Sequence, residues 1–354
     1  MAFSITLQPG NNNFPAETGE TILDAALKHG QTIPFSCRDG ACGMCKGRVL
    51  QGSVDHGKFQ EFALSATERA AGMALFCCAK PKSNLVIERL QMSTPFGMPA
   101  MSIPPAWTAP ASAEAPSKTM PCRVEKMERV AEDVMVLYLK LPPSEPMKFL
   151  AGQYINILTE DGRQHSFSLG NAPHDNKFLQ LHIRMIPGGD FTHHVFTQMK
   201  ERDILRISGP FGAFVLHEDS AKPIIFIAGG TGIAPVKAII EHALHDGIDR
   251  DMHLYWGVCK RADLYLLDLA KQWQARGILF TPVLSEPLAE DNWRGKTGFA
   301  HQAVMENYSD LSGHQVYASG GPVMVESAYR DLTTLLGLPK EEFLTDSFTH
   351  EPKM

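Results

Sequence analysis

The segment FSCRDGACGMCKGRVL, residues 35–50, sets the interpretation of the first part of this chain. It contains three cysteines at the spacing C-x4-C-x2-C, and the later segment ALFCCAKP, residues 74–81, adds two more. The five clustered residues are Cys37, Cys42, Cys45, Cys77 and Cys78. The 354 residues include seven cysteines in total, and an odd number fits a disulfide framework poorly. Clustering of this kind indicates metal or redox chemistry in a reducing compartment.

Cysteines at the same spacing ligate the 2Fe–2S cluster of plant-type ferredoxins, in which the fourth ligand is a cysteine from further along the chain. The segment LFCCAKP resembles their fourth-ligand pattern L-T-C-x-A-x-P. This resemblance implies that the ligands are Cys37, Cys42, Cys45 and Cys77, with Cys78 as a neighbour. A zinc site and buried free thiols are the alternatives, although zinc ligands usually come in paired short spacings.

The overall composition excludes some classes of protein. Acidic residues outnumber basic ones by 39 to 33, which gives a net charge of −6. Nucleic-acid binding is not expected, because phosphate recognition needs a concentrated basic surface. The first residues, MAFSITLQPGNNNF, do not have the pattern of a secretory signal, and no stretch approaches the roughly 18 apolar residues of a membrane helix. We therefore expect a cytoplasmic protein with no membrane partner.

Local patterns divide the chain into four parts. Residues 1–91 alternate strand-like and helix-like pieces, with a helix cap at Thr21 and a capping box of Ser65 and Glu68. We expect here a small mixed α+β domain that resembles the β-grasp fold of plant-type ferredoxins. Residues 92–119 are rich in Pro, Ala, Ser and Met without an apolar period, which predicts a linker. A packed loop anchored by apolar side chains is the alternative.

The other two parts differ in their balance of strands and helices. Residues 120–217 contain many strand candidates and few helices, which predicts a sandwich or small antiparallel β-barrel. The segment PIIFIAGG, residues 223–230, is a continuous apolar run, as in parallel strands that are buried on both faces. Strand-like and helix-like stretches alternate through residues 218–354, which predicts a doubly wound α/β domain.

Several segments of these two parts resemble the ferredoxin–NAD(P)H reductase superfamily. The first is GRQHSFSLGNAP, residues 162–173, which is similar to the family's strand motif R-x-Y-S or R-x-Y-T against the flavin of FAD. The matched residues are His165, Ser166, Phe167 and Ser168. The resemblance implies that the Ser168 hydroxyl bonds near the reactive flavin N5. His165 replaces the expected arginine, and Arg163, on the same face of the strand, is a candidate substitute. A purely structural strand is the alternative.

The second segment is IPGGDFTHHVF, residues 186–196. A tight turn followed by a helix start, which Thr192 is predicted to begin, presents free N–H groups to a phosphate. In the family the matching stretch holds the flavin phosphates, which implies Gly189, Phe191 and Thr192. An ordinary helix entry is the alternative.

The third segment is FIAGGTGIAPVKAII, residues 226–240, which predicts a buried strand, a glycine loop and a helix that begins near Pro235. It lacks the G-x-G-x-x-G of the common dinucleotide fold. It resembles instead the GGTG-x-[AS]-P loop of the same reductases, which faces the nicotinamide end of NAD(P)H. The residues implied are Gly230, Thr231, Gly232 and Pro235. The sequence does not distinguish NADH from NADPH.

Two segments near the end of the chain continue the resemblance. YASGGPVMVESA, residues 317–328, is similar to the family's C-G-x-P-x-M stretch beside the nicotinamide. It implies Ser319, Gly320 and Met324, and serine in place of cysteine predicts reduced activity, not its loss. FLTDSFTHE, residues 343–351, resembles an F-x-x-D-A-F ending, which implies Phe348 over the flavin or, alternatively, a core aromatic.

The order of the parts resembles the CDP-6-deoxy-Δ3,4-glucoseen reductase family, and reductases of multicomponent oxygenases share it. The resemblance implies an electron path from NAD(P)H through FAD and a 2Fe–2S cluster to a protein acceptor. A hydride carries two electrons and the cluster accepts one, so a flavin is needed between them. The resemblance implies that this acceptor is a CDP-hexulose dehydrase or, alternatively, an oxygenase component. A flavin-poor redox sensor and a free-flavin reductase are the alternatives from other classes.

Overall fold

The computed structural model describes residues 2–31, 33, 35, 38, 40, 43, 45–61, 63–89 and 119–347. It divides into two compact units, Met1–Ser117 with Phe211–Ala213, and Lys118–Pro210 with Phe214–Met354. The expected linker, residues 92–119, lies outside the described residues except for its last position. The predicted site residues Cys37, Cys42 and Phe348 also lie outside them.

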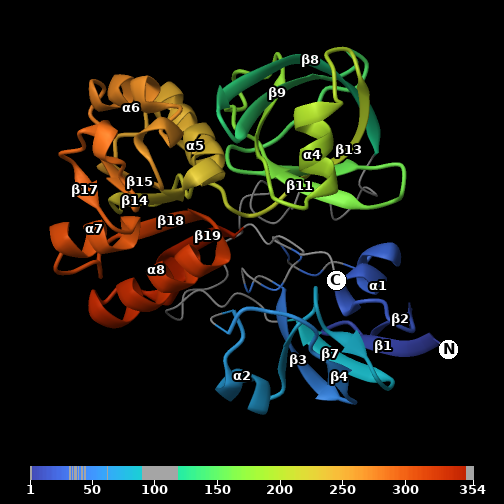
Figure 1. Ribbon diagram of the computed structural model, residues 1–354. Coiled ribbons are helices and arrows are strands. Elements are labelled where there is room, and N and C mark those ends of the chain that lie inside the picture. The colour runs from blue at the N-terminus through green and yellow to red at the C-terminus, as the bar shows by residue number, and fades with distance from the viewer. Residues whose placement is uncertain are drawn as a thin grey trace. The chain divides into compact units, whose positions relative to one another are not determined.

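The first unit is a small mixed α+β domain (Figure 1, blue to cyan). Its elements are β1 (Ala2–Gln8), β2 (Asn12–Glu17), α1 (Ile22–Lys28), β3 (Lys46–Gln51), β4 (Val54–Asp55), α2 (Ala66–Ala70), β5 (Met73–Leu75), β6 (Lys80–Pro81) and β7 (Leu85–Arg89). The main sheet has the order β2-β1-β7-β3-β5, in which β1 and β7 are parallel and the other pairs antiparallel. The predicted mixed fold is confirmed.

Both predicted helix caps of this unit are present. Thr21 Oγ1 accepts the backbone N–H of Asp24 at 3.1 Å at the start of α1. Ser65 and Glu68 form both bonds of a capping box at the start of α2. These side chains satisfy N–H groups that have no partner within the helix, which explains why two such short helices begin where they do.

The green strands of Figure 1 form an antiparallel barrel in the second unit. They are β8 (Met120–Ala131), β9 (Val134–Lys140), β10 (Tyr154–Leu158), β11 (Gln164–Ser168), β12 (Leu179–Arg184) and β13 (Ile204–Phe211), with the helix α4 (Asp190–Thr197). The order is β11-β10-β13-β8-β9-β12. An antiparallel bridge between Leu169, which follows β11, and Leu181 of β12 joins the two ends of this order. The barrel expectation is confirmed.

The last part of the second unit is a doubly wound α/β sheet (Figure 1, yellow to red). Its strands are β14 (Ile224–Gly229), β15 (Met252–Val258), β16 (Leu279–Leu284), β17 (Lys296–Thr297), β18 (Gln315–Gly320) and β19 (Phe343–Ser347), all parallel in the order β17-β16-β15-β14-β18-β19. The helices are α5 (Ile233–Asp246), α6 (Leu267–Gln274), α7 (Ala300–Asn307) and α8 (Pro322–Leu335), and the 3-10 turns are η1 (Gly230–Gly232), η2 (Arg261–Asp263), η3 (Ala289–Asp291) and η4 (Lys340–Glu342).

The central strands of this sheet are buried on both faces, because α5 and α6 cover one face and α7 and α8 the other (Figure 1). Ile224, Phe226 and Ala228 of β14 pack with Trp256 in one apolar cluster. Burial on both faces explains the continuous apolar run in the sequence. The strand ends nearest the glycine loop are thereby held rigidly.

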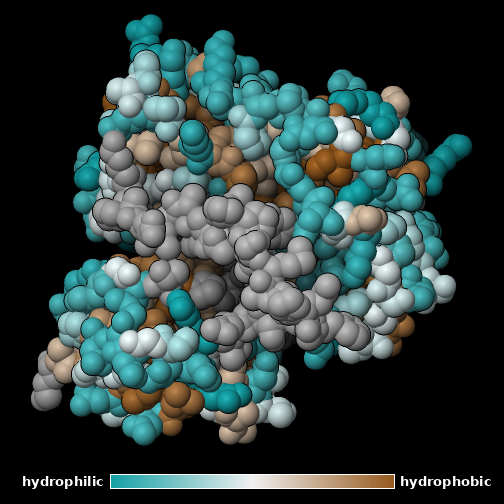
Figure 2. Space-filling view, turned by 180° about the vertical axis from the view of Figure 1, so that it is seen from behind, coloured by the Kyte–Doolittle hydropathy of each residue, from teal (hydrophilic) through white to brown (hydrophobic). Residues whose placement is uncertain are grey.

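Hydrophilic side chains cover most of the coloured surface in Figure 2, and apolar ones lie in small separate groups. Exposed large apolar residues include Ile204, Phe299 and Val323, which come from different elements. Among the helices of the described residues, none has the length and apolarity that a membrane crossing requires.

Candidate functional site

Two of the four predicted cluster ligands can be located, and they lie together. Cys45 and Cys77 are both buried, and the backbone N–H of Cys77 donates to Cys45 Sγ at 3.4 Å. An N–H donor directed at a ligand sulfur helps to set the potential of an iron–sulfur cluster. The buried pair and its donor therefore fit a cluster, to which Cys37 and Cys42 would contribute from outside the described residues.

Strand β11 divides the predicted flavin residues between its two faces. The His165 ring stacks on Phe191 of α4 with centroids 4.8 Å apart, and the Phe167 ring lies 5.5 Å from the same phenyl group. The Ser166 hydroxyl donates instead to Asn156 Oδ1 of β10 at 2.7 Å. The structure therefore gathers His165, Phe167 and Phe191 into one aromatic group and places Ser166 away from it.

Arg163, the candidate substitute for the missing arginine, is bound by carboxylates. Its Nε donates to Asp161 Oδ2 at 2.6 Å and its Nη1 to Asp190 Oδ2 at 3.1 Å. Burial, with a further contribution from Arg163, lowers the pKa of His165, so its imidazole is neutral at pH 7. Among the described residues, His165 Nε2 has no hydrogen-bond partner. The histidine nitrogen is therefore unsatisfied, whereas Arg163 gives two of its five N–H donors to carboxylates.

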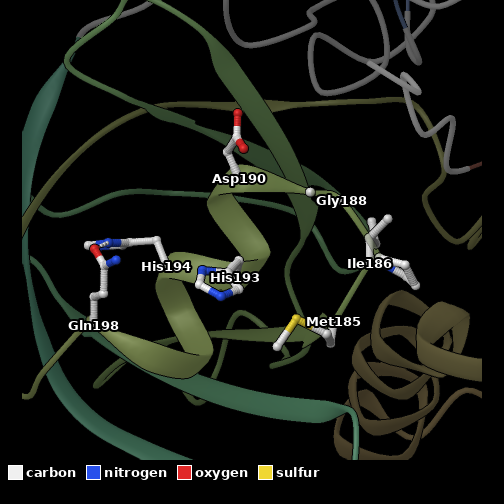
Figure 3. Close-up of a pocket in the computed structure, with 9 residues that line it drawn as sticks. Met185, Ile186, Gly188, Asp190, His193, His194 and Gln198 are labelled. Carbon is white, nitrogen blue, oxygen red and sulfur yellow. Dashed lines mark hydrogen bonds between the residues drawn. The ribbon is translucent and has the colours of Figure 1, made fainter. Parts of the chain in front are cut away.

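A pocket of about 500 Å³ lies beside the predicted phosphate loop. Figure 3 shows the loop from Met185 to Gly188 on one side and α4 on the other, with His193 and His194 projecting from the helix and Gln198 directly after its end. His194 Nδ1 lies 3.1 Å from Gln198 Oε1. The pocket offers imidazole and amide groups next to a glycine turn, together with the carboxylate of Asp190.

Thr192 closes this turn with its hydroxyl. Thr192 Oγ1 accepts the N–H of Ile186 at 3.1 Å and donates to the carbonyl of Gly189 at 3.1 Å. Helix α4 begins at Asp190, so the predicted start at Thr192 is wrong by two residues. The extended backbone of Gly189 supplies the cap, and Thr192 already lies in the first turn.

The predicted nicotinamide loop follows β14 directly. Its η1 turn holds Gly230, Thr231 and Gly232, and α5 begins at Ile233, two residues before Pro235. A side-chain carbon at Gly232 would lie 2.1 Å from the carbonyl oxygen of Ser319, so only glycine fits at this position.

The strand that brings Ser319 to this loop also brings the other residues of its segment. Strands β14 and β18 are parallel neighbours, with Ala228 paired to Ser319. Gly320 ends β18, and Met324 of α8 lies against both Gly229 and Gly320. The glycine loop and the predicted nicotinamide stretch thus form one surface at the carboxyl end of the sheet, where open α/β folds bind their ligands.

Ser319 and Ser168 are linked by a residue that the sequence analysis did not name. The Ser168 hydroxyl donates to Asp346 Oδ2 at 2.6 Å, and Asp346 is the β19 partner of Ser319 in the sheet register. Ser319 is fully buried, and its Oγ has no hydrogen-bond partner within the described part of the chain. An unpaired buried hydroxyl is costly, so this one fits a site that is completed by a ligand.

A buried lysine joins the barrel to the α/β sheet close to this site. Lys237 of α5 is only 8% exposed, and its Nζ donates to the carbonyl of Gly170 at 2.8 Å. The same ammonium pairs with Glu241 at 2.7 Å. Gly170 lies two residues after Ser168, so the contact ties the helix behind the glycine loop to the predicted flavin strand.

A second contact crosses the same junction. His182 Nδ1 of β12 lies 2.9 Å from the Tyr265 hydroxyl, and Tyr265 packs edge-on against Trp256. The Trp256 indole N–H donates to the carbonyl of Gly230 at 3.0 Å. Burial, with Lys237 adding to it, lowers the pKa of His182 to about 3. Burial also raises the pKa of Tyr265, so both groups are neutral at pH 7.

Models of three protein families match successive parts of the chain. The 2Fe-2S iron-sulfur cluster binding domain matches residues 5–82, the oxidoreductase FAD-binding domain residues 121–216 and the oxidoreductase NAD-binding domain residues 226–330. A curated relative, CDP-6-deoxy-L-threo-D-glycero-4-hexulose-3-dehydrase reductase of Yersinia pseudotuberculosis, is 36% identical over 350 residues, 98% of this chain and 99% of the relative. The chain belongs to this family of iron–sulfur flavoprotein reductases.

The family extends to proteins that serve oxygenases. Phenol hydroxylase P5 protein of Acinetobacter pittii is 33% identical over 94% of this reductase and 90% of its own length. The crystal structure of the Amycolatopsis cytochrome reductase GcoB has a TM-score of 0.74 and 31% identity, with 98% of this reductase and 99% of that chain covered.

These findings confirm the predicted fold, enzyme class and cofactors. The reductase is an NAD(P)H-dependent oxidoreductase that passes electrons through FAD and a 2Fe–2S cluster. The matches favour the cluster over a zinc site, and a reductase over a flavin-poor sensor. The individual site residues stay predictions.

Proposed function

We propose that this reductase delivers electrons to a dehydrase that acts on a CDP-linked deoxyhexulose. The observation that carries the proposal is the end-to-end similarity to the dehydrase reductase of Yersinia pseudotuberculosis, whose name states its partner. The alignment covers 98% of this chain and 99% of the relative, so all three parts of this chain have a counterpart in it.

We assign the cluster to Cys37, Cys42, Cys45 and Cys77, and the flavin to strand β11, which carries His165, Phe167 and Ser168. When bound there, FAD would supply the conversion between two-electron and one-electron chemistry that the cluster needs. The aromatic group around Phe191 offers the flavin side an apolar wall. His165 offers a neutral donor or acceptor through its free Nε2.

In this proposal Ser168 and Asp346 are the residues of the chain that hold a proton at the site. The Ser168 proton is held by Asp346 Oδ2, which leaves the serine oxygen as an acceptor toward the flavin side. Ser319, which we assign to the nicotinamide side, is the sheet partner of Asp346, and its buried hydroxyl has no hydrogen-bond partner among the described residues. In this proposal Ser168 acts on the flavin side and Ser319 on the nicotinamide side. Asp346 is a neighbour of both serines.

The domain limits in this proposal are those expected from the sequence: a ferredoxin over 1–91, a linker over 92–119, a flavin barrel over 120–217 and a nicotinamide domain over 218–354. We place the activity in the cytoplasm, as expected from the sequence, because a reducing compartment keeps the cysteine ligands of a cluster available.

The proposal is tested by reconstitution with two acceptors. The reductase is mixed anaerobically with NADH and either the purified CDP-6-deoxy-L-threo-D-glycero-4-hexulose-3-dehydrase with its substrate or a phenol hydroxylase oxygenase component. We expect NADH oxidation to be coupled to product formation at least tenfold faster with the dehydrase. Preferential turnover of the oxygenase component would overturn the assigned acceptor and leave the reductase assignment intact.

Two controls separate docking from electron supply. Reduction of cytochrome c, a general one-electron acceptor, must be equal in both mixtures before the partners are added. A Cys42→Ala variant must lose turnover with both acceptors, because both are supplied through the cluster in this proposal. Turnover that survives this substitution would mean that electrons leave the flavin directly.

A further inference from the structure

Two consecutive thiols lie side by side in the first unit. Cys77 and Cys78 occupy a turn in which the N–H groups of Cys78 and Ala79 both donate to the carbonyl of Leu75, at 3.0 and 2.8 Å. In a strand, consecutive side chains point to opposite faces. Here the turn brings the two Sγ atoms to 3.6 Å, within the range of a sulfur hydrogen bond.

The Cys78 thiol also lies against the loop that carries the other predicted ligands. A side-chain carbon at Gly40, between Cys37 and Cys42 in the sequence, would lie 2.8 Å from Cys78 Sγ. Gly40 has a φ of +78°, so this position is restricted both by its backbone and by the thiol packed on it. Cys78 is half-buried between this loop and Cys77.

We propose that Cys78 is a functional thiol of the cluster site, which donates its S–H to the sulfur of Cys77 and raises the reduction potential of the cluster. The proposal rests on the assignment of Cys77 as a ligand in the proposed function. A reduced cluster carries more negative charge on its ligand sulfurs than an oxidised one. A hydrogen bond to such a sulfur therefore stabilises the reduced form more, and the potential rises.

This thiol adds to a donor that is already present. The backbone N–H of Cys77 donates to Cys45 Sγ, so the site has an N–H aimed at one ligand sulfur and an S–H aimed at another. The backbone donor is present with any side chain, whereas the S–H depends on the residue at 78. Position 78 is thus where a single substitution can change the potential without removing a ligand.

The test is a redox titration of the holoprotein followed by the electron paramagnetic resonance signal of the reduced cluster. In Cys78→Ala, the ratio of reduced to oxidised cluster at the wild-type midpoint is expected to fall about tenfold, which is 59 mV for a one-electron couple. Cys78→Ser keeps a donor at the same position and is expected to restore the ratio. Cys259→Ala removes an exposed thiol in the second unit and should leave the potential unchanged.

Iron content and flavin absorbance are measured on every variant, so loss of the cluster is not mistaken for a change in potential. An unchanged potential in Cys78→Ala, or equal shifts in the alanine and serine variants, would refute the hydrogen bond and leave the proposed electron path standing. Loss of the cluster in Cys78→Ala with retention in Cys77→Ala would show that Cys78 is the ligand, which overturns both this proposal and the ligand assignment on which it rests.

Discussion

Replacement of Lys237 by methionine tests whether the junction between the barrel and the α/β sheet aligns the nicotinamide with the flavin. Methionine keeps an unbranched apolar side chain and removes the ammonium. The substitution deletes the 2.8 Å hydrogen bond to the Gly170 carbonyl and the 2.7 Å ion pair with Glu241. Only the first of these contacts crosses the junction, because Glu241 lies on α5 with the lysine.

The size of the effect follows from burial. A hydrogen bond to a charged group contributes about 1.5–3 kcal/mol, and the low exposure of Lys237 places this one outside the weak class of surface pairs. The Glu241 side chain is 24% exposed and can be hydrated when its partner is lost. The junction contact alone therefore corresponds to about a 10- to 150-fold change in the population of the aligned arrangement.

The rate of hydride transfer is sensitive to this alignment, since a misplacement of about 1 Å can lower a rate on the order of 100-fold. We expect anaerobic flavin reduction by saturating NADH, followed by stopped-flow absorbance, to be at least tenfold slower in Lys237→Met. The FAD content and the spectrum of the oxidised protein should be unchanged. Lys271→Met is the matched control, because Lys271 is an exposed lysine on α6 that pairs with Asp268 of the same helix.

Wild-type flavin reduction in Lys237→Met, with an unchanged thermal midpoint, would refute the alignment role. A slower rate that reaches the wild-type value at higher NADH would also count against it, because alignment acts on the bound complex and not on affinity. A double-mutant cycle that combines Lys237→Met with Glu241→Gln separates the effect of losing the ion pair with Glu241 from the effect of losing the hydrogen bond to Gly170.

Three further predictions concern the cluster, the nicotinamide side and the junction histidine. Cys42→Ala should abolish cytochrome c reduction while slower dye reduction by the flavin persists, and retention of both activities would contradict the electron path. Ser319→Ala should raise the unfolding free energy of the nucleotide-free protein by about 1 kcal/mol, since it removes an unpaired buried hydroxyl, yet slow flavin reduction by NADH. His182 has a pKa of about 3 when folded, against an ordinary 6.5, so the unfolded chain binds more protons and stability falls as the pH drops below about 6.5. At pH 4.5 this group costs roughly 3 kcal/mol in urea unfolding, a loss that should be absent in His182→Gln.

Local patterns were sufficient to predict most elements of the fold. The continuous apolar run of β14, the capping box of α2 and the cap of α1 each carry a local physical signature, and the structure contains all three. Strand β2 was missed because NNFPAE has no strong apolar alternation and contains Pro15. The structure tolerates this proline because β2 lies at the edge of its sheet, next to β1.

The residues that join distant parts of the chain were not predictable in this way. Asp346 bonds Ser168 across 178 positions of sequence, and His182 meets Tyr265 across 83. Lys237 reaches Gly170 across 67. A periodicity or motif describes a segment and its own backbone, so it contains no information about a partner supplied by another domain. The glycine loop was predictable, whereas the contacts that orient it were not.

The protonation states of His182 and Tyr265 decide whether their contact at the junction contributes to the pH dependence of flavin reduction. His182 is neutral above about pH 3, and burial keeps Tyr265 neutral well above pH 7. The ammonium of Lys237 is compensated by Glu241. Between pH 5 and 9 the His182 and Tyr265 contacts therefore keep one protonation state, and the alignment that they maintain is constant. A change in the hydride-transfer rate over this interval would therefore not originate in the protonation of these two residues.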